Sequence, residues 1–494
     1  MNNWDLTILM PIILVLGLAV FCFLIFNEKL KKDVIFFILE VAIFWIAAGF
    51  ITFQFSSSKL LAISSISKAG YIILLLFSSS LFTIFLKPIA TFFTGVIRMR
   101  KVWLWISYGC LIIISLILFI VPAINATTFI VGSIFLSVLL ATSTIHYLFL
   151  NEQYFYRINT LPVTWILFTV IGFSTLLSFY FSNLQEVVIK SNFKYIDLSC
   201  LFMGIIVLAM SFIKKENKST AGVFDPTVIS QLPKKNNYYL LLIYCLTFFI
   251  ALTYYLSSSL TTKYFIQIRL IEKQYAQETI RLMSRLFDLS FLAPSILVSY
   301  FIFKYLLKYF GQKYFFVINN FLLFGCYTAL AFITNPFAFL CVNILIGVFY
   351  NQLIYTLFSV CMFWNYRAPK NPVTGFFGSA LFGAKYLVES LEGIMLKNKV
   401  GSFKEIEVVD NLVLPNTNLS TISSDFADVI TILFSICAVI LLLCALIFYY
   451  TSNKIFVDFV NYRLATQNLK NILKRRVIEK TKTQIDVENL ELSE

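Results

Sequence analysis

The sequence contains YRINTLPVT at 156–164 and YRAPKNPVT at 366–374, so the pattern Y-R-x4-P-V-T occurs twice. A second pair of segments agrees with the first, because FLKP at 85–88 is matched by FLAP at 291–294. Both pairs keep the same order along the chain, and their separations are similar. We therefore expect an internal duplication of two parallel units.

The composition is that of a membrane protein. The 494 residues are 59% hydrophobic and 13% charged, whereas a soluble protein carries roughly 25% charged residues. The apolar residues form blocks of about 20, the length of a membrane-spanning helix, and lack the alternation typical of β-barrel strands. The sequence predicts an all-α polytopic membrane protein.

Thirteen spans are expected from these apolar blocks. They cover 8–26, 34–55, 68–97, 103–122, 128–150, 162–182, 196–213, 238–258, 284–310, 314–334, 337–364, 372–396 and 428–450. The first block lacks the basic flank and the cleavage site of a signal peptide, so we expect it to stay as an extra N-terminal transmembrane helix.

The remaining twelve spans divide six and six at the polar segment 214–237. The expected organisation is a helix and loop at 1–33, a six-helix bundle at 34–213, a linker at 214–237, a second six-helix bundle at 238–450 and a basic tail at 451–494. Both copies of Y-R-x4-P-V-T then lie between the fourth and fifth helix of a bundle. This equivalence supports the duplication.

The charge pattern predicts topology and excludes some functions. The net charge is +14, but the 39 Lys and Arg residues are spread over short loops, with a bias of roughly two to one toward one side of the membrane. This bias predicts an N-terminus outside, a C-terminus in the cytoplasm and a location in the cell membrane, and it argues against nucleic acid. The nine cysteines show no CxxC spacing, so we expect neither a metal nor a cofactor.

This arrangement resembles the major facilitator superfamily (MFS) in its six-plus-six helices, its central cytoplasmic loop and its repeated basic loop between the second and third helix of each half. FGQK at 310–313 matches part of the family's loop pattern, but neither loop has the family's Asp. The resemblance implies a divergent transporter that binds a small solute between its halves.

In that family, the first and fourth helix of each half line the central cavity. By position, the mid-depth residues of these helices are Trp45, Thr142, Thr247 and Tyr350, and Asn351, Gln352 and Tyr355 lie near the last of them. Polar groups at this depth face protein or water. Two interpretations are open, namely substrate contact and hydrogen bonding between helices.

Ionisable residues inside the expected spans are candidates for proton coupling and for gates of the transport path. Glu40 and the single histidine, His146, form a possible proton path, the alternative being a structural hydrogen bond. Lys87 has two interpretations, as an anion site or as the partner of a carboxylate such as Glu40. Lys385 and Glu389 stand four residues apart, as a structural pair or an outer gate.

The two arginines of the repeated pattern, Arg157 and Arg367, have two interpretations, as topological corners or as inner-gate latches. The function that fits the whole sequence is secondary active transport of a small polar solute, in a monomer, by rocking of two halves with possible proton coupling. The alternatives are a polytopic lipid or glycosyl transferase and a non-transporting scaffold or receptor. The sequence favours a non-enzyme, because the outer loops lack a histidine and any metal-ligand spacing.

Overall fold

The protein is all-helical. The computed structural model describes residues 3–65, 67–121, 125–155, 160–184, 194–213, 215–216, 237–365, 372–405, 419–452 and 455, and these residues contain no strand. Twelve helical segments within this described part are long and apolar enough to cross a membrane. The predicted class, an all-α polytopic membrane protein, is confirmed.

The first part of the chain folds into an extra helix and six further spans. A π-helical turn, Asp5–Leu9, continues into α1 (Met10–Asn27). The first half then consists of α2 (Lys32–Ser65), α3 (Lys68–Leu76), α4 (Ser79–Ile97), α5 (Lys101–Ile120), α6 (Ala126–Tyr154), α7 (Thr160–Leu184) and α8 (Lys194–Ile213). A break at Phe77 and Ser78 divides one span into α3 and α4, because the Ser78 hydroxyl accepts the Leu81 N–H and starts a new helix.

The second half repeats this plan. It consists of α10 (Asn237–Ser257), α11 (Leu260–Glu272), α12 (Gln277–Phe332), α13 (Pro336–Asn365), α14 (Val373–Lys397), a 3₁₀ turn at Gly401–Glu405 and a final helix, Leu419–Ser452. α12 carries two of the candidate spans, Gln277–Tyr305 and Lys313–Phe332. The loop expected between 310 and 314 is helical, so the sequence-based boundary there is wrong.

α14 shows how polarity and burial combine in this bundle. It was expected as a span at 372–396, but it is not among the twelve strongly apolar segments. It carries Lys385, Glu389 and Glu392, yet it packs against α4 and α10 in the interior. Its charged side chains therefore face protein or a space that protein encloses, as polar groups in a spanning helix should.

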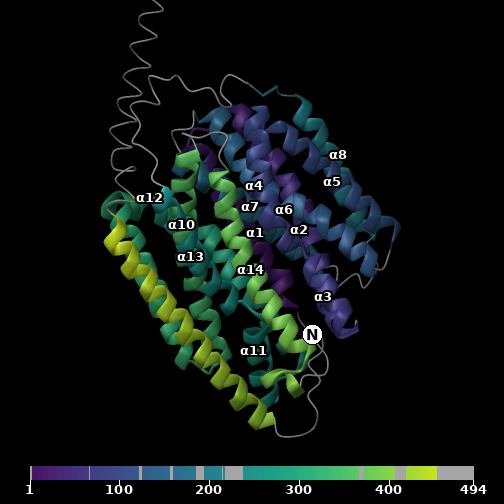
Figure 1. Ribbon diagram of the computed structural model, residues 1–494, viewed down its shortest axis with the longest axis vertical. Helices are drawn as coiled ribbons and strands as arrows, with labels where there is room; N and C mark the ends of the chain where they lie inside the picture. Colours follow the sequence, from purple (N-terminus) through teal and green to yellow (C-terminus); the bar gives the residue numbers. More distant parts are fainter. Residues whose placement is uncertain are drawn as a thin grey trace, which may run out of the picture.

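The two halves meet along α4 and α14, while α5 and α8 lie on one flank and the final helix lies on the other (Figure 1). The approach is close at Gly375, where a Cβ atom would lie 2.6 Å from the Pro88 Cα atom and 2.7 Å from the Lys87 carbonyl oxygen. Pro88 lies inside α4, and Pro294 lies at the matching place inside α12. The FLKP and FLAP segments are thus equivalent in the fold.

The N-terminus and α11 lie at the same end of the bundle, which we call the α11 end (Figure 1). α1 packs on both α7 and α12, so it contacts both halves. The structure therefore has the expected extra helix, and it places that helix across the seam between the halves.

Candidate functional site

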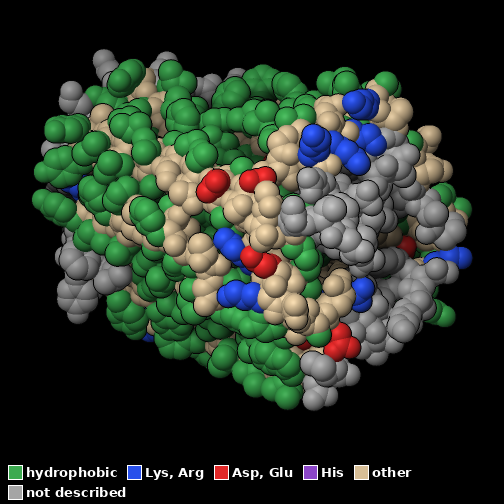
Figure 2. All heavy atoms as spheres, turned by 90° about the horizontal axis from the view of Figure 1, so that it is seen from below, with side chains coloured by type: hydrophobic (Ala, Val, Ile, Leu, Met, Phe, Trp, Pro, Cys, Tyr) green, Lys and Arg blue, Asp and Glu red, His purple; other side chains and the backbone are tan. Residues whose placement is uncertain are grey.

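A cavity of about 600 Å³ lies between the two halves. The first half contributes residues of α2 and α7, such as Phe53, Ser56 and Phe179, and the second half contributes residues of α10 to α14. Seen from the α11 end, charged side chains of both signs lie near the middle of the face, with further charged side chains toward one side and a largely apolar area on the other (Figure 2). The size of the cavity is that of a small-molecule binding site.

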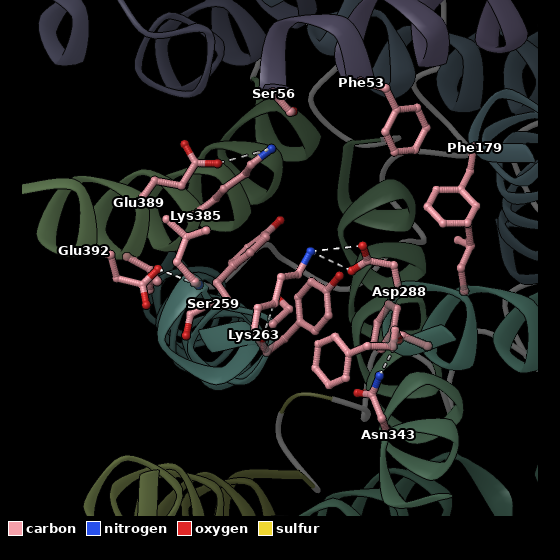
Figure 3. A pocket seen from close by; sticks show the side chains of 18 of the residues that line it. Phe53, Ser56, Phe179, Ser259, Lys263, Asp288, Asn343, Lys385, Glu389 and Glu392 are labelled. Atoms are coloured by element: carbon pink, nitrogen blue, oxygen red, sulfur yellow. Dashed lines mark hydrogen bonds and ion pairs between the residues drawn. The ribbon is translucent and has the colours of Figure 1, made fainter. Parts of the chain in front are cut away.

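Two ion pairs line the cavity, and both come from the second half (Figure 3). The Lys263 ammonium on α11 lies 2.9 Å from the Asp288 carboxylate on α12. The Lys385 ammonium lies 3.7 Å from the Glu389 carboxylate, one turn further along α14. These side chains are 28–41% exposed, so solvent and solutes reach them.

A third carboxylate, that of Glu392, belongs to the structure of the wall. It accepts the N–H groups of Leu260 and Thr261 at 3.1 Å each, and the Thr261 hydroxyl at 2.5 Å. These are the first residues of α11, whose N-terminal amides have no partner within the helix. Glu392 therefore holds α11 against α14.

Aromatic rings form the deeper wall of the cavity. Tyr254 on α10 stacks on Phe291 of α12 with a centroid distance of 4.4 Å, and on Tyr350 of α13 at 4.5 Å. Tyr254 and Phe291 line the cavity, while Tyr350 is buried and packs against both rings outside the lining. Asn343 on α13 also lines the cavity, and its amide donates to the Phe287 carbonyl oxygen and the Ser290 hydroxyl at 2.9 Å each.

None of the seven residues predicted to bind substrate lines this cavity. On α13, Asn351 donates to the Gly347 carbonyl oxygen and Gln352 to the Ser299 carbonyl oxygen, while the Tyr355 ring packs on Phe168 at 4.4 Å. These contacts join α13 to itself, to α12 and to α7. The interpretation as hydrogen bonding and packing between helices fits Gln352 and Tyr355, whereas the Asn351 bond lies within α13. Substrate contact by these residues stays a prediction.

The other predicted substrate residues lie inside their own halves. The Thr142 hydroxyl accepts the Trp103 N–H at 3.2 Å and donates to the Ser107 hydroxyl at 2.7 Å. Thr247 is buried in α10, and its hydroxyl has no hydrogen-bond partner among the described residues. Trp45 contacts His146, as described next.

Glu40 and His146 lie on either side of Tyr108 in the core of the first half. The Tyr108 hydroxyl donates to Glu40 Oε1 at 2.7 Å and lies 3.3 Å from His146 Nε2. The Trp45 indole donates to His146 Nδ1 at 3.2 Å, so in the neutral ring Nε2 carries the proton. This order aligns a chain of hydrogen bonds from His146 through Tyr108 to Glu40.

Lys87 is a buried lysine without a carboxylate partner among the described residues. Its ammonium donates to the Ser143 and Thr144 hydroxyls of α6, at 2.7 and 3.3 Å. It also lies 5.2 Å from the centroid of the Phe382 ring of α14. Glu40 bonds to Tyr108 instead, so the pairing of Lys87 with Glu40 does not occur here.

Lys385 and Glu389 are the only predicted gating residues in the described part of the chain. They line the cavity, and Glu389 also accepts the Ser80 hydroxyl of α4 at 3.1 Å, which links the two halves. Arg157 and Arg367 lie outside the described residues. Whether they act as corners or latches stays a prediction.

An ion-pair network at the start of α5 was not expected. The Arg100 guanidinium is almost fully buried and donates to both oxygens of Glu152 at 3.1 and 2.9 Å, to the Thr94 hydroxyl at 2.7 Å and to the Thr91 carbonyl oxygen at 3.1 Å. Next to it, the Glu216 carboxylate accepts the N–H groups of Arg100 and Lys101 at 2.9 Å each. Burial raises the pKa of Glu216, and these two hydrogen bonds oppose the rise.

Sequence reasoning also missed Lys263 and Asp288. Asp288 lies inside the expected span 284–310, and an ionisable residue within a span is a functional candidate. That signal was present in the sequence. Lys263 carried no such signal, because its segment was expected to lie outside the membrane.

Comparison with known proteins shows a similarity of fold. No protein-family model and no curated protein sequence matches the chain. Among solved structures, the chain is similar to the human organic anion transporter MFSD10 (TETRAN), with a TM-score of 0.50 and 13% sequence identity, covering 83% of this chain and 100% of the other. At this identity the likeness concerns the fold.

Proposed function

Because the chain has the fold of the major facilitator superfamily, we propose that it is a secondary active transporter of a small polar solute. The observation that carries this proposal is the cavity between the two halves, which is lined by residues of both and reachable from the α11 end. In an alternating-access cycle, rocking of the halves closes this entrance and opens the opposite one. The solute then crosses without a continuous pore.

The remaining sequence-based expectations belong to this proposal. The proposal includes two six-helix bundles at 34–213 and 238–450, a monomeric state, and a location in the cell membrane with the N-terminus outside. With that orientation the cavity faces outward. The alternatives, a membrane-embedded transferase and a non-transporting scaffold or receptor, predict no solute flux.

A flux assay tests the proposal directly. The purified protein is reconstituted in liposomes, and uptake of labelled amino acids, sugars, nucleosides and organic acids is compared with that of empty liposomes. Ser56→Trp places a large side chain in the cavity and should abolish the flux. Ser199→Trp, at an exposed position on α8, is the matched control and should retain it. Absence of flux for every solute class contradicts transport and favours the alternatives.

Proton coupling is the finer part of the proposal. It is supported by the hydrogen-bond chain from His146 through Tyr108 to Glu40, which is fully buried in the first half. Tyr108→Phe removes the hydroxyl that joins the two ionisable groups. We expect uptake driven by an inward proton gradient to be lost, while exchange of labelled for unlabelled solute continues.

The control for this variant is Tyr195→Phe, because Tyr195 is 74% exposed on α8. This control variant should change neither the uptake driven by the proton gradient nor the exchange of labelled for unlabelled solute. If Tyr108→Phe and Glu40→Gln both leave gradient-driven uptake intact, proton coupling through this chain is excluded. If the unmodified protein itself shows no gradient-driven uptake, proton coupling is excluded altogether and the transport is facilitated.

A further inference from the structure

Two lysines and two carboxylates of the cavity lining form ion pairs, and a third carboxylate is hydrogen-bonded to the wall. The described cations of the lining are Lys263 and Lys385, and its described carboxylates are those of Asp288, Glu389 and Glu392. Glu392 is engaged by the amides at the start of α11. The two groups that face the open space are therefore ion pairs, each with one ammonium and one carboxylate (Figure 3).

We propose that this cavity binds a free amino acid, a zwitterion whose carboxylate is held by a lysine of one ion pair and whose ammonium is held by a carboxylate of the wall. The inference rests on the proposed function and names its substrate class. Its basis is the paired arrangement of Lys385 with Glu389 and of Lys263 with Asp288.

The balance of charge separates the possible ligands. A solute with a single charge binds only one partner of an ion pair, and the other partner is then left without a counter-ion. An unpaired charge costs free energy in a partly enclosed site. A zwitterion gives both partners of the ion pair a new counter-ion at once. Its carboxylate can face the lysine while its neighbouring ammonium faces the carboxylate of the wall. The separation of 2.9–3.7 Å within each pair suits charges on one carbon atom better than the distant charges of a peptide.

Other cations of the region do not add a surplus of positive charge to the cavity. Arg285 makes two hydrogen bonds to Asp5, at 2.6 and 3.0 Å. Lys87 is buried against α6 and is not part of the lining, and Arg281 is not part of it either. An organic anion would therefore meet lysines that already have carboxylate partners.

The rest of the lining suits an apolar side chain. The aromatic rings of Tyr254, Phe287 and Phe291 stand beside the charged pairs, and Phe53 and Phe179 stand on the wall of the first half. The volume of about 600 Å³ leaves room for one amino acid with an aromatic or branched side chain. This composition favours large apolar amino acids.

A charge series tests the inference on the full-length protein in detergent. The probes are phenylalanine, the cation phenethylamine, the anion 3-phenylpropanoate and the dipeptide phenylalanylphenylalanine. We expect phenylalanine to raise the melting temperature and to bind at least about tenfold more tightly than either singly charged analogue. The dipeptide should bind more weakly than the amino acid.

Neutralising one partner of an ion pair should change the preferred charge of the ligand. In Glu389→Gln the lysine is left alone, so 3-phenylpropanoate should bind more tightly than phenylalanine. In Lys385→Gln the preference should turn to phenethylamine. Lys215→Gln removes an exposed lysine that does not line the cavity and should leave the wild-type order unchanged. A variant that merely unfolds cannot show such an opposite pair of preferences.

Equal binding of all three charge forms, tighter binding of the dipeptide, or no binding by phenylalanine or any other large apolar amino acid overturns the inference. If a sugar or an organic anion is transported while amino acids are neither bound nor transported, the inference fails and the transport function stands. If no solute of any class crosses the membrane, the proposed function itself fails.

Discussion

Among the ion pairs of the described residues, that of Arg100 and Glu152 is the most deeply buried. Its two side chains are 1% and 6% exposed, and the guanidinium donates to both carboxylate oxygens. The remaining donors reach Thr91 and Thr94, so the charge is well compensated. Loss of one partner leaves an uncompensated charge in the interior, which costs far more than loss of an exposed pair.

Glu152→Gln should therefore destabilise the protein by about 3–5 kcal/mol, seen as a large fall in melting temperature. The control is Glu272→Gln, which removes the carboxylate of a partly exposed pair with Arg269 and should cost less than about 1 kcal/mol. The double variant Arg100→Met/Glu152→Leu should recover much of the loss, because neither member of the pair is left behind without its partner. Equal effects of the two single variants would contradict this account.

The residues of the site were only partly predictable. Lys385 and Glu389 were found because both lie inside a span, four residues apart, and their geometry follows from helix periodicity. Lys263 reaches the cavity because α11 continues beyond α10 after a break at Ser258 and Ser259, and the sequence does not reveal the direction of that continuation. Likewise, the link between Glu40 and His146 depends on Tyr108, which comes from a third helix.

Among pairs of elements, α4 and α14 make the closest contact between the halves. Gly375 touches the backbone of α4, and the Ser379 hydroxyl donates to the Ile84 carbonyl oxygen at 2.5 Å. Gly383, two turns further along, faces Phe248 of α10 instead. Small residues let helices in a membrane pack at short distance, where dispersion and hydrogen bonds hold them together.

The same substitution at two glycines of α14 should have opposite results. In Gly375→Ala the new Cβ atom would lie 2.6 Å from the α4 backbone, so the helices must separate, at a cost of about 1–3 kcal/mol. In Gly383→Ala the nearest atom is 3.7 Å away, and alanine favours the helix by roughly 1 kcal/mol. We expect the melting temperature to fall in the first variant and to hold or rise in the second. A similar change in both would show that the contact with α4 does not limit packing.

Twelve of the thirteen expected spans correspond to strongly apolar helices of the described residues, because apolar blocks report such helices directly, and α14 is the exception. The errors lie where backbone behaviour depends on tertiary context. The span expected at 68–97 breaks at Phe77 because Ser78 caps a new helix, and the loop expected after 310 is helical in α12. Hydropathy records neither a cap nor the continuity of a helix, so such boundaries stay uncertain from sequence alone.

In the molecule as a whole, α1 is attached to the two halves in different ways. Polar contacts at both of its ends reach α12 of the second half. Asp5 pairs with Arg285 at one end, while Glu28 accepts the Tyr300 hydroxyl and lies 3.6 Å from the Lys304 ammonium at the other. Its contact with α7 of the first half is apolar, with Gly17 against the Phe173 ring and Met10 in a cluster with Leu176.

In the proposed transport cycle, in which the two halves rock, this asymmetry predicts that α1 moves with the second half. Directed ion pairs and hydrogen bonds fix α1 on α12, whereas an apolar contact permits sliding within the membrane. A covalent link between α1 and α7 would then join the two halves. A link between α1 and α12 would join parts that already move together.

Two cysteine pairs distinguish these cases, in a background where the exposed Cys22, Cys245 and Cys341 are replaced by Ala. Gly17→Cys/Phe173→Cys, joined by a short thiol cross-linker, should abolish uptake into liposomes, and reduction should restore it. Phe23→Cys/Phe301→Cys joins α1 to α12, where the two rings lie 5.4 Å apart, and should leave uptake nearly unchanged. If the first link leaves uptake intact, α1 does not bridge parts that move relative to one another, and the rocking of the two halves about this seam is excluded.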